Sequence, residues 1–193
     1  MTPMPAFSSL LPLTLSLLLF HHHHHLLAAT ADAPTDAPAT TAGSPLIEKA
    51  CNGSQYKDLC ISTLNSDQGS KTTDLKGLAF ISLKNAVKNA SDTAVKIKKL
   101  LSGKGPGPSV DDGLLSCEKE YNDIVDQIDD SINALVSGAF DDVNNWLEAA
   151  LADIETCDEN LGDKVVDITH RNEILRQLCS NCLSIVNVLS HKG

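Results

Sequence analysis

Two cysteines placed symmetrically about a glycine constrain this chain more than any other feature. Apolar residues recur in steps of three and four from Leu114 to Leu161, the period of helices that bury one face. Gly138 lies near the middle of this stretch, where it can take the left-handed conformation that ends a helix. Cys117 and Cys157 each lie about 20 residues from Gly138. Because both helices rise equally per residue, we expect the two sulfurs side by side in a helical hairpin.

The first 31 residues have the composition of a secretory signal peptide. They contain no Asp, Glu, Lys or Arg, and an almost unbroken apolar run extends from Leu10 to Phe20. Small residues precede Asp32, so we expect cleavage after Ala31. The apolar run is shorter than the roughly 20 residues that span a bilayer, which disfavours a membrane anchor. His21 to His25 lie inside this removable segment, so we assign them no metal site in the mature protein.

The rest of the chain divides into a lead-in and one domain. Residues 32–45 are rich in Ala, Thr, Pro and Asp, which predicts a flexible segment. Residues 46–193 are expected to form one compact unit. Two further amphipathic patterns run from Asp74 to Leu101 and from Gly162 to about Leu189, and the Gly- and Pro-rich residues 102–109 separate the first from the central hairpin. We therefore predict an all-α, up-down-up-down four-helix bundle.

The chain has six cysteines, which in a secreted protein favour disulfides over zinc binding or catalysis. Cys51 and Cys60 flank the turn signal Asn52-Gly53-Ser54, with short helical patterns before and after it at residues 46–50 and 56–64. A smaller, N-terminal helical hairpin with its own bridge is the simplest interpretation.

Cys179 and Cys182 lie three residues apart on the last helix. Two buried thiols are the favoured interpretation, and a strained bond between the two is the alternative. A redox pair of the thioredoxin type needs a βαβ context, and nothing in the sequence predicts a strand.

The sequence offers no catalytic constellation. His170 and His191 are the only histidines outside the leader, too few for the Glu-x-x-His pairs of a di-metal bundle. No serine lies in a nucleophile elbow, and no glycine run follows a strand to bind phosphate. We therefore predict neither an enzyme nor a metal or cofactor site. Carboxylates are plentiful, but most are expected on solvent faces: Asp111, Asp112, Asp123, Asp126, Asp129, Asp130, Asp141, Asp142 and Asp153.

Composition and short motifs indicate which classes of partner and modification the chain can have. With 25 acidic residues against 15 basic ones, a nucleic-acid partner is disfavoured. Asn52-Gly53-Ser54 and Asn89-Ala90-Ser91 are candidate glycosylation sites. Trp146 falls beside Leu147 and off the apolar stripe, so it is either partly buried packing or an exposed anchor for a partner.

Several motifs together resemble one known family. They are Ala50-Cys51 with Cys60, Asp74-Leu75-Lys76-Gly77-Leu78-Ala79, Leu115-Ser116-Cys117-Glu118-Lys119-Glu120-Tyr121, Trp146-Leu147-Glu148-Ala149-Ala150-Leu151, Glu155-Thr156-Cys157 and Leu178-Cys179-Ser180-Asn181. On these residues the chain resembles the plant invertase and pectin methylesterase inhibitor family from about Leu46 onward. The resemblance implies a four-helix bundle with an N-terminal helical hairpin and two bridges, Cys51 to Cys60 and Cys117 to Cys157.

The resemblance also implies a function. It predicts a secreted, monomeric protein inhibitor of the cell wall or vacuole that covers the active-site cleft of a carbohydrate-acting enzyme. Invertase inhibitors of this family carry a Pro-Lys-Phe motif ahead of the third bundle helix, where this chain has Gly138-Ala139-Phe140. We therefore favour pectin methylesterase as the target over acid invertase, with a non-inhibitory secreted bundle as the third hypothesis. Phe140, Asp141 and Trp146 are the candidate partner contacts, and packing at the helix start is the alternative for Phe140.

Overall fold

The computed structural model of the protein describes residues 44–103 and 107–191. The predicted signal peptide, His21 to His25 within it, and residues 32–43 of the predicted lead-in lie outside this range. Across the described residues every regular element is helical, as the sequence predicts.

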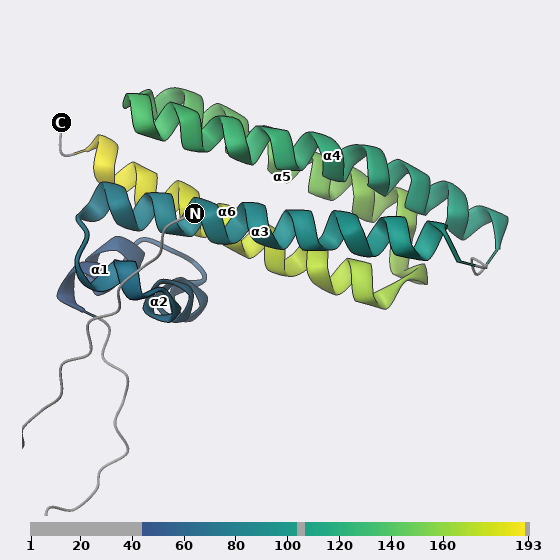
Figure 1. The fold of residues 1–193 in the computed structure, drawn as a ribbon, viewed down its shortest axis with the longest axis horizontal. Coiled ribbons are helices and arrows are strands. Elements are labelled where there is room, and N and C mark those ends of the chain that lie inside the picture. The colour runs from purple at the N-terminus through teal and green to yellow at the C-terminus, as the bar shows by residue number, and fades with distance from the viewer. Residues whose placement is uncertain (1–43, 104–106, 192–193) are drawn as a thin grey trace, which may run out of the picture. The chain divides into compact units, whose positions relative to one another are not determined.

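Four long helices form the bundle. They are α3 (Leu75–Leu101), α4 (Pro108–Ser137), α5 (Phe140–Leu161) and α6 (Val166–Ser190). Each packs against two of the others in the ring α3, α4, α5, α6, and α4 with α5 share the most extensive interface. Successive helices run in opposite directions, as Figure 1 shows. The predicted up-down-up-down bundle is therefore confirmed.

A smaller helical hairpin precedes the bundle. It consists of α1 (Pro45–Cys51) and α2 (Lys57–Ser66), followed by the 3₁₀ turn η1 (Gln68–Lys71). The Ser54 hydroxyl donates to the side-chain oxygen of Asn181 in α6 and accepts a bond from the Tyr56 amide at 2.9 Å. This pair of bonds joins the loop of the small hairpin to the last bundle helix.

Two helices begin earlier than the apolar pattern indicates, and both begin with proline. α1 starts at Pro45, where the Ile47 amide donates to the Ser44 hydroxyl, so the last residues of the predicted lead-in belong to the fold. α4 starts at Pro108, inside the predicted 102–109 break. Proline suits the first helical position because its missing N–H would have no partner there and its φ is already helical.

The predicted helix ends at Asp74 and Gly138 have the expected capping geometry. The Asp74 carboxylate accepts a bond of 2.8 Å from the Gly77 amide at the start of α3. Gly138 has φ 80°, and the amides of Gly138 and Ala139 donate back to carbonyls of the last turn of α4. A second glycine with positive φ, Gly162, ends α5 before the 3₁₀ turn η2 (Gly162–Lys164).

The core is one continuous apolar cluster between the four helices. The predicted stripes supply it, with most of their members fully buried and the remainder half-buried at its edge: Leu101, Val125, Ile132, Leu151 and Leu189. None of the described helices combines the length and the apolar content needed to cross a membrane.

Candidate partner-binding surface

Trp146 is exposed on α5. The buried face of α5 follows steps of three and four through Val143, Leu147, Ala150 and Ile154, and Trp146 lies one residue before Leu147, about 100° around the helix. Its side chain keeps 40% of its surface accessible. A large aromatic with this exposure is the kind of residue that anchors protein interfaces, and a partner contact at Trp146 stays a prediction.

Phe140 and Asp141 open α5 beside a surface hollow. Phe140 is half-buried and packs against the core, whereas Asp141 is exposed. The lining of the hollow combines the turn, the first residues of α5 and the end of α6: Gly138, Ala139, Phe140, Asp141, Asp142 and Ser190. Phe140 thus combines core packing with a place on the lining.

Two disulfides crosslink the described helices, and one of them joins the two helices of the central hairpin. Cys117–Cys157 joins α4 to α5 at the end of the hairpin remote from Gly138, and Cys51–Cys60 joins α1 to α2. These are the pairs that the family resemblance implies. Because the Cys117–Cys157 bridge closes a segment of 40 residues that includes most of both helices, it restricts sliding of α4 against α5 and so fixes the register of the surface.

A buried polar network lies beside the Cys117–Cys157 bridge. The Tyr121 hydroxyl donates to Asn172 Oδ1 at 2.6 Å, and Asn172 Nδ2 contacts Cys157 Sγ and donates to Asp158. Asp158 pairs in turn with Arg176. Tyr121 and Asn172 have no accessible surface, and burial raises the pKa of Tyr121 well above its ordinary value. This network joins α4, α5 and α6 at the end of the bundle away from the exposed Trp146.

Comparison with known proteins identifies the family. The family model for the plant invertase/pectin methylesterase inhibitors matches residues 45–185, which is most of the chain and all six α-helices up to the last turns of α6. The chain belongs to this family.

Curated relatives of this chain are named either as pectinesterase inhibitors or as inhibitors of invertase or fructosidase. A pectinesterase inhibitor of Actinidia deliciosa is 28% identical over 79% of this chain and 83% of its own length. A putative invertase inhibitor of Platanus acerifolia is 30% identical over 68% and 75%. A cell wall / vacuolar inhibitor of fructosidase of Arabidopsis thaliana is 30% identical over 75% and 83%.

A solved structure shares the fold. The crystal structure of mutant form A of a pectin methylesterase inhibitor from Arabidopsis superposes with a TM-score of 0.64, covering 73% of this chain and 95% of its own. Its sequence is 23% identical, so it supports the fold and not the target.

The remaining two cysteines of this family member are free and buried. Cys179 and Cys182 lie on α6 without accessible surface, and the Ser82 hydroxyl of α3 lies 3.1 Å from Cys182 Sγ. Burial raises the pKa of Cys182 to about 12 and that of Cys179 well above its ordinary value. The structure therefore has two buried thiols and no bond between them.

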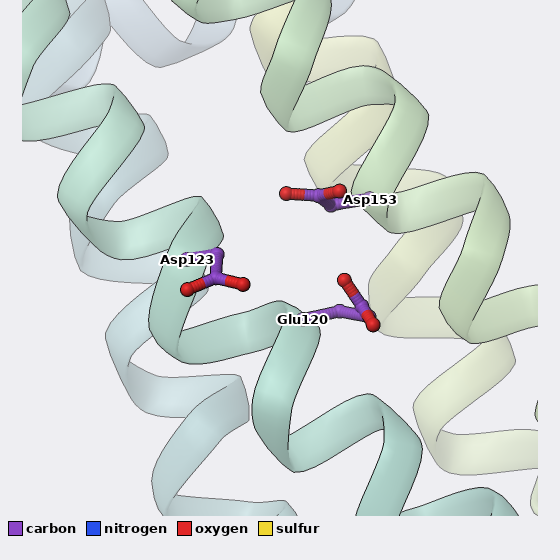
Figure 2. Close-up of side chains that lie close together, drawn as sticks. All are labelled: Glu120, Asp123 and Asp153. Atoms are coloured by element: carbon purple, nitrogen blue, oxygen red, sulfur yellow. The ribbon is translucent and has the colours of Figure 1, made fainter.

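Three carboxylates from α4 and α5 lie close together, as Figure 2 shows. One oxygen from each of Glu120, Asp123 and Asp153 lies within 4.8 Å of the others. Lys119 Nζ lies 3.0 Å from Asp123 and 3.5 Å from Glu120, and Gln127 donates to Asp153 at 2.7 Å. Because the ammonium group of Lys119 and the amide of Gln127 already bind these oxygens, we interpret the cluster as part of a polar network that extends from the buried Glu120 to the surface.

Seven of the nine Asp residues expected mainly on solvent faces are exposed, whereas Asp111 and Asp153 are half-buried, and Glu120 is a buried carboxylate that was not predicted. Glu120 is buried, and its spacing of three from Cys117 and four from Ile124 places it on the buried side of α4. That spacing was available in the sequence. Asp153 is half-buried between α4 and α5 because Gln127 of α4 reaches it, whereas Asp123 is exposed as expected.

The two candidate glycosylation residues differ in setting. Asn52 is exposed immediately after α1 in the loop that the Cys51–Cys60 bridge closes. Asn89 lies inside α3 and is half-buried, with its Oδ1 atom inaccessible. The side chain of Asn52 is therefore more accessible for an attached sugar than that of Asn89.

Proposed function

We propose that this chain is a secreted inhibitor of a plant pectin methylesterase that acts by binding over the active-site cleft of the enzyme. Family membership supports an inhibitory role, and several relatives are named as pectinesterase inhibitors. The exposed Trp146 on a disulfide-stapled hairpin supports a binding function, because a rigid surface loses little entropy on association.

The residues around Phe140 are the observation on which the proposed target rests. Gly138-Ala139-Phe140 replaces the Pro-Lys-Phe motif of invertase inhibitors, so the cationic side chain of that motif is missing. The remaining aromatic packs against the core instead of projecting freely. Both features favour pectin methylesterase.

Acid invertase is the second candidate. Phe140 is retained at the start of α5 and lines the adjacent hollow, and two relatives at 30% identity carry invertase or fructosidase inhibitor names. We propose further that the mature protein begins after Ala31, acts as a monomer without a cofactor, and is exported to the cell wall, with the vacuole as the alternative location.

A paired inhibition assay tests this proposal. The oxidised domain is titrated at about pH 5 against a cell-wall pectin methylesterase and an acid invertase, and residual activity is followed. We expect near-equimolar chain to abolish the esterase activity and leave the invertase active. Loss of only the invertase activity would transfer the assignment to the second candidate. Full activity of both enzymes, with the helical circular dichroism spectrum intact, would favour a non-inhibitory bundle.

A further inference from the structure

Negative charge is concentrated on the α4–α5 hairpin. Residues 108–161 contain fifteen Asp and Glu and a single basic residue, Lys119, whereas the rest of the chain has ten acidic and fourteen basic residues. Helix α3 has the opposite balance, with six Lys and one Asp. The net charge of the whole chain is therefore unevenly distributed, with a strongly negative α4–α5 hairpin and a positive helix α3.

The charges near the Gly138 end of the hairpin are free to act on a partner. Exposed carboxylates there form no salt bridge with any cation among residues 44–103 and 107–191: Asp126, Asp129, Asp130, Asp141 and Asp142. Unpaired charges of one sign repel each other, and together they produce a local potential that attracts an oppositely charged surface.

Helical register places Trp146 within this charged surface. Trp146 lies two turns before Asp153 on the same side of α5, and Asp153 accepts its hydrogen bond from Gln127 of α4. Two turns after Gln127 is Ala134, which is buried, and the register places it opposite Trp146 across the hairpin. We call this surface the outer face. It comprises the exposed Asp123 and Asp130 of α4 and Asp142 and Trp146 of α5, with the half-buried Gln127, Ala149 and Asp153 beside them.

The outer face combines an aromatic ring with carboxylates on both helices. Asp142 lies one turn before Trp146 on α5, and Asp130 lies one turn before Ala134 on α4. An exposed indole attracts a cation that lies over its ring, and carboxylates beside it can accept hydrogen bonds from the same cation. The combination matches a Lys or Arg side chain, whereas an anionic partner would be repelled.

We propose that the outer face is the docking surface for a positively charged segment of the target enzyme, with a Lys or Arg side chain of that enzyme lying over Trp146 between Asp130 and Asp142. This inference rests on the proposed function, because it assumes an enzyme target. It adds the chemical character of that target: among pectin methylesterases, the chain selects those with a basic surface beside the cleft. Charge complementarity of this kind acts mainly on the association rate and on the rejection of wrong partners.

Two variants and two matched controls test the proposal on the inhibited enzyme. Trp146→Ala removes the aromatic ring, and its control is Val166→Ala, which truncates an apolar side chain that is 75% exposed on α6. Asp130→Asn with Asp142→Asn removes two carboxylates of the outer face, and its control is Asp58→Asn with Asp163→Asn, which removes two exposed carboxylates outside the hairpin.

The expected result is specific to the outer face. Trp146→Ala should raise the concentration for half-inhibition by about tenfold or more, the usual effect of losing a central interface aromatic. The Asn double variant should slow association several-fold and weaken its salt dependence. Both controls should match the parent chain. Parent-like inhibition by Trp146→Ala and by the Asn double variant would overturn the docking proposal while leaving the inhibitory function intact.

A second measurement tests the cation-binding property of the outer face if the parent chain inhibits neither enzyme. Trp146 is the only tryptophan of the chain, so its fluorescence reports directly on the outer face. We expect a saturable change in emission on titration with a short Lys- and Arg-containing peptide at low salt, no change with a Glu-containing peptide, and loss of the response in the Asn double variant. An unchanged emission with the cationic peptide would overturn the cationic specificity of the face, independently of whether any enzyme is inhibited.

Discussion

The hydroxyl of Tyr121 is the residue-scale feature with the clearest energetic consequence. It is inaccessible and donates to Asn172 Oδ1, which has no other donor among the described residues. Tyr121→Phe removes the donor and leaves a buried acceptor unpaired, so we expect a loss of about 1–3 kcal/mol in the free energy of unfolding. Urea unfolding measures this loss. Tyr56→Phe is the control, because Tyr56 is only half-buried and its hydroxyl bonds to no described group.

The same tyrosine predicts a dependence of stability on alkaline pH. Burial raises the pKa of Tyr121 in the folded state above its unfolded value, which is about 10. The folded protein therefore binds this proton more tightly than the unfolded chain. The resulting stability is fully present below about pH 10 and is lost as pH rises beyond it. The Tyr121→Phe variant should lose less stability than the parent between neutral pH and pH 11, and parallel pH profiles of the two would contradict this assignment.

Cys179 and Cys182 should be unreactive in the folded protein. Both thiols are fully buried, so a reagent in solution does not reach them. The pKa of Cys182 is raised to about 12, so its reactive thiolate form is scarce at neutral pH. We expect a colorimetric thiol reagent at pH 8 to detect no thiol in the native chain and both in urea. Rapid reaction of one thiol without denaturant would show that α6 opens locally at this point.

Residue-scale features differ in how far the sequence predicts them. The exposure of Trp146 could not be decided in advance, because a residue at the edge of an apolar stripe is buried or exposed according to how close the neighbouring helix lies. The network of Tyr121, Asn172 and Asp158 depends on the relative register of three helices, which no single helical pattern contains. Glu120, in contrast, was recoverable from its spacing to Cys117 alone.

At the scale of elements, Gly113 sets the distance between α4 and α5. A Cβ atom built there would lie 2.8 Å from the carbonyl oxygen of Asn160 and 3.2 Å from the Cα of Leu161, so the helices must separate to accept any side chain. Gly113→Ala should therefore destabilise the protein by about 1–3 kcal/mol, as overpacking does, although alanine has the higher helix propensity. Thermal unfolding checks this. Asn122→Ala, at an exposed position of α4, should be neutral or slightly stabilising.

Element positions follow from the sequence except where proline begins a helix. Apolar periodicity locates the buried centre of each helix, and Asp74 and Gly138 locate two of the ends through their capping groups. The first turns of α1 and α4 bury little apolar surface, so periodicity does not detect them. Pro45 and Pro108 act as N-terminal helix residues there, although proline near a Gly-rich segment is usually read as a break.

At the scale of the whole molecule, the fold is largely implicit in the sequence and the target is not. Burial of four apolar stripes needs only the chain itself, so periodicity and the spacing of Cys117 and Cys157 about Gly138 predict the bundle. Selection of a partner depends also on the surface of the other molecule, and the sequence of this chain determines only the shape and charge of its own surface. The uneven division of charge between α3 and the α4–α5 hairpin is visible in the sequence. Only the structure shows which of the described carboxylates form no salt bridge and can therefore attract a partner.

The two disulfides should differ in their effect on the whole molecule. Cys117–Cys157 closes a segment of 40 residues within the bundle, and Cys51–Cys60 closes one of 9 in the small hairpin. In the chain-entropy model these loops correspond to about 4 and about 2.6 kcal/mol of stabilisation. We expect Cys117→Ala with Cys157→Ala to lower the free energy of unfolding by the larger amount and to accelerate amide exchange throughout α4 and α5.

The matched double variant, Cys51→Ala with Cys60→Ala, should act locally. Because Ile47 and Leu64 are buried and Ser54 bonds to Asn181, the small hairpin should stay docked, with faster exchange confined to α1 and α2. Urea unfolding followed by circular dichroism, with hydrogen exchange read by mass spectrometry, compares the two variants. Equal losses of stability, or bundle-wide exchange after loss of Cys51–Cys60, would mean that the small hairpin supports the bundle as a whole, and that the α4–α5 surface depends on both bridges.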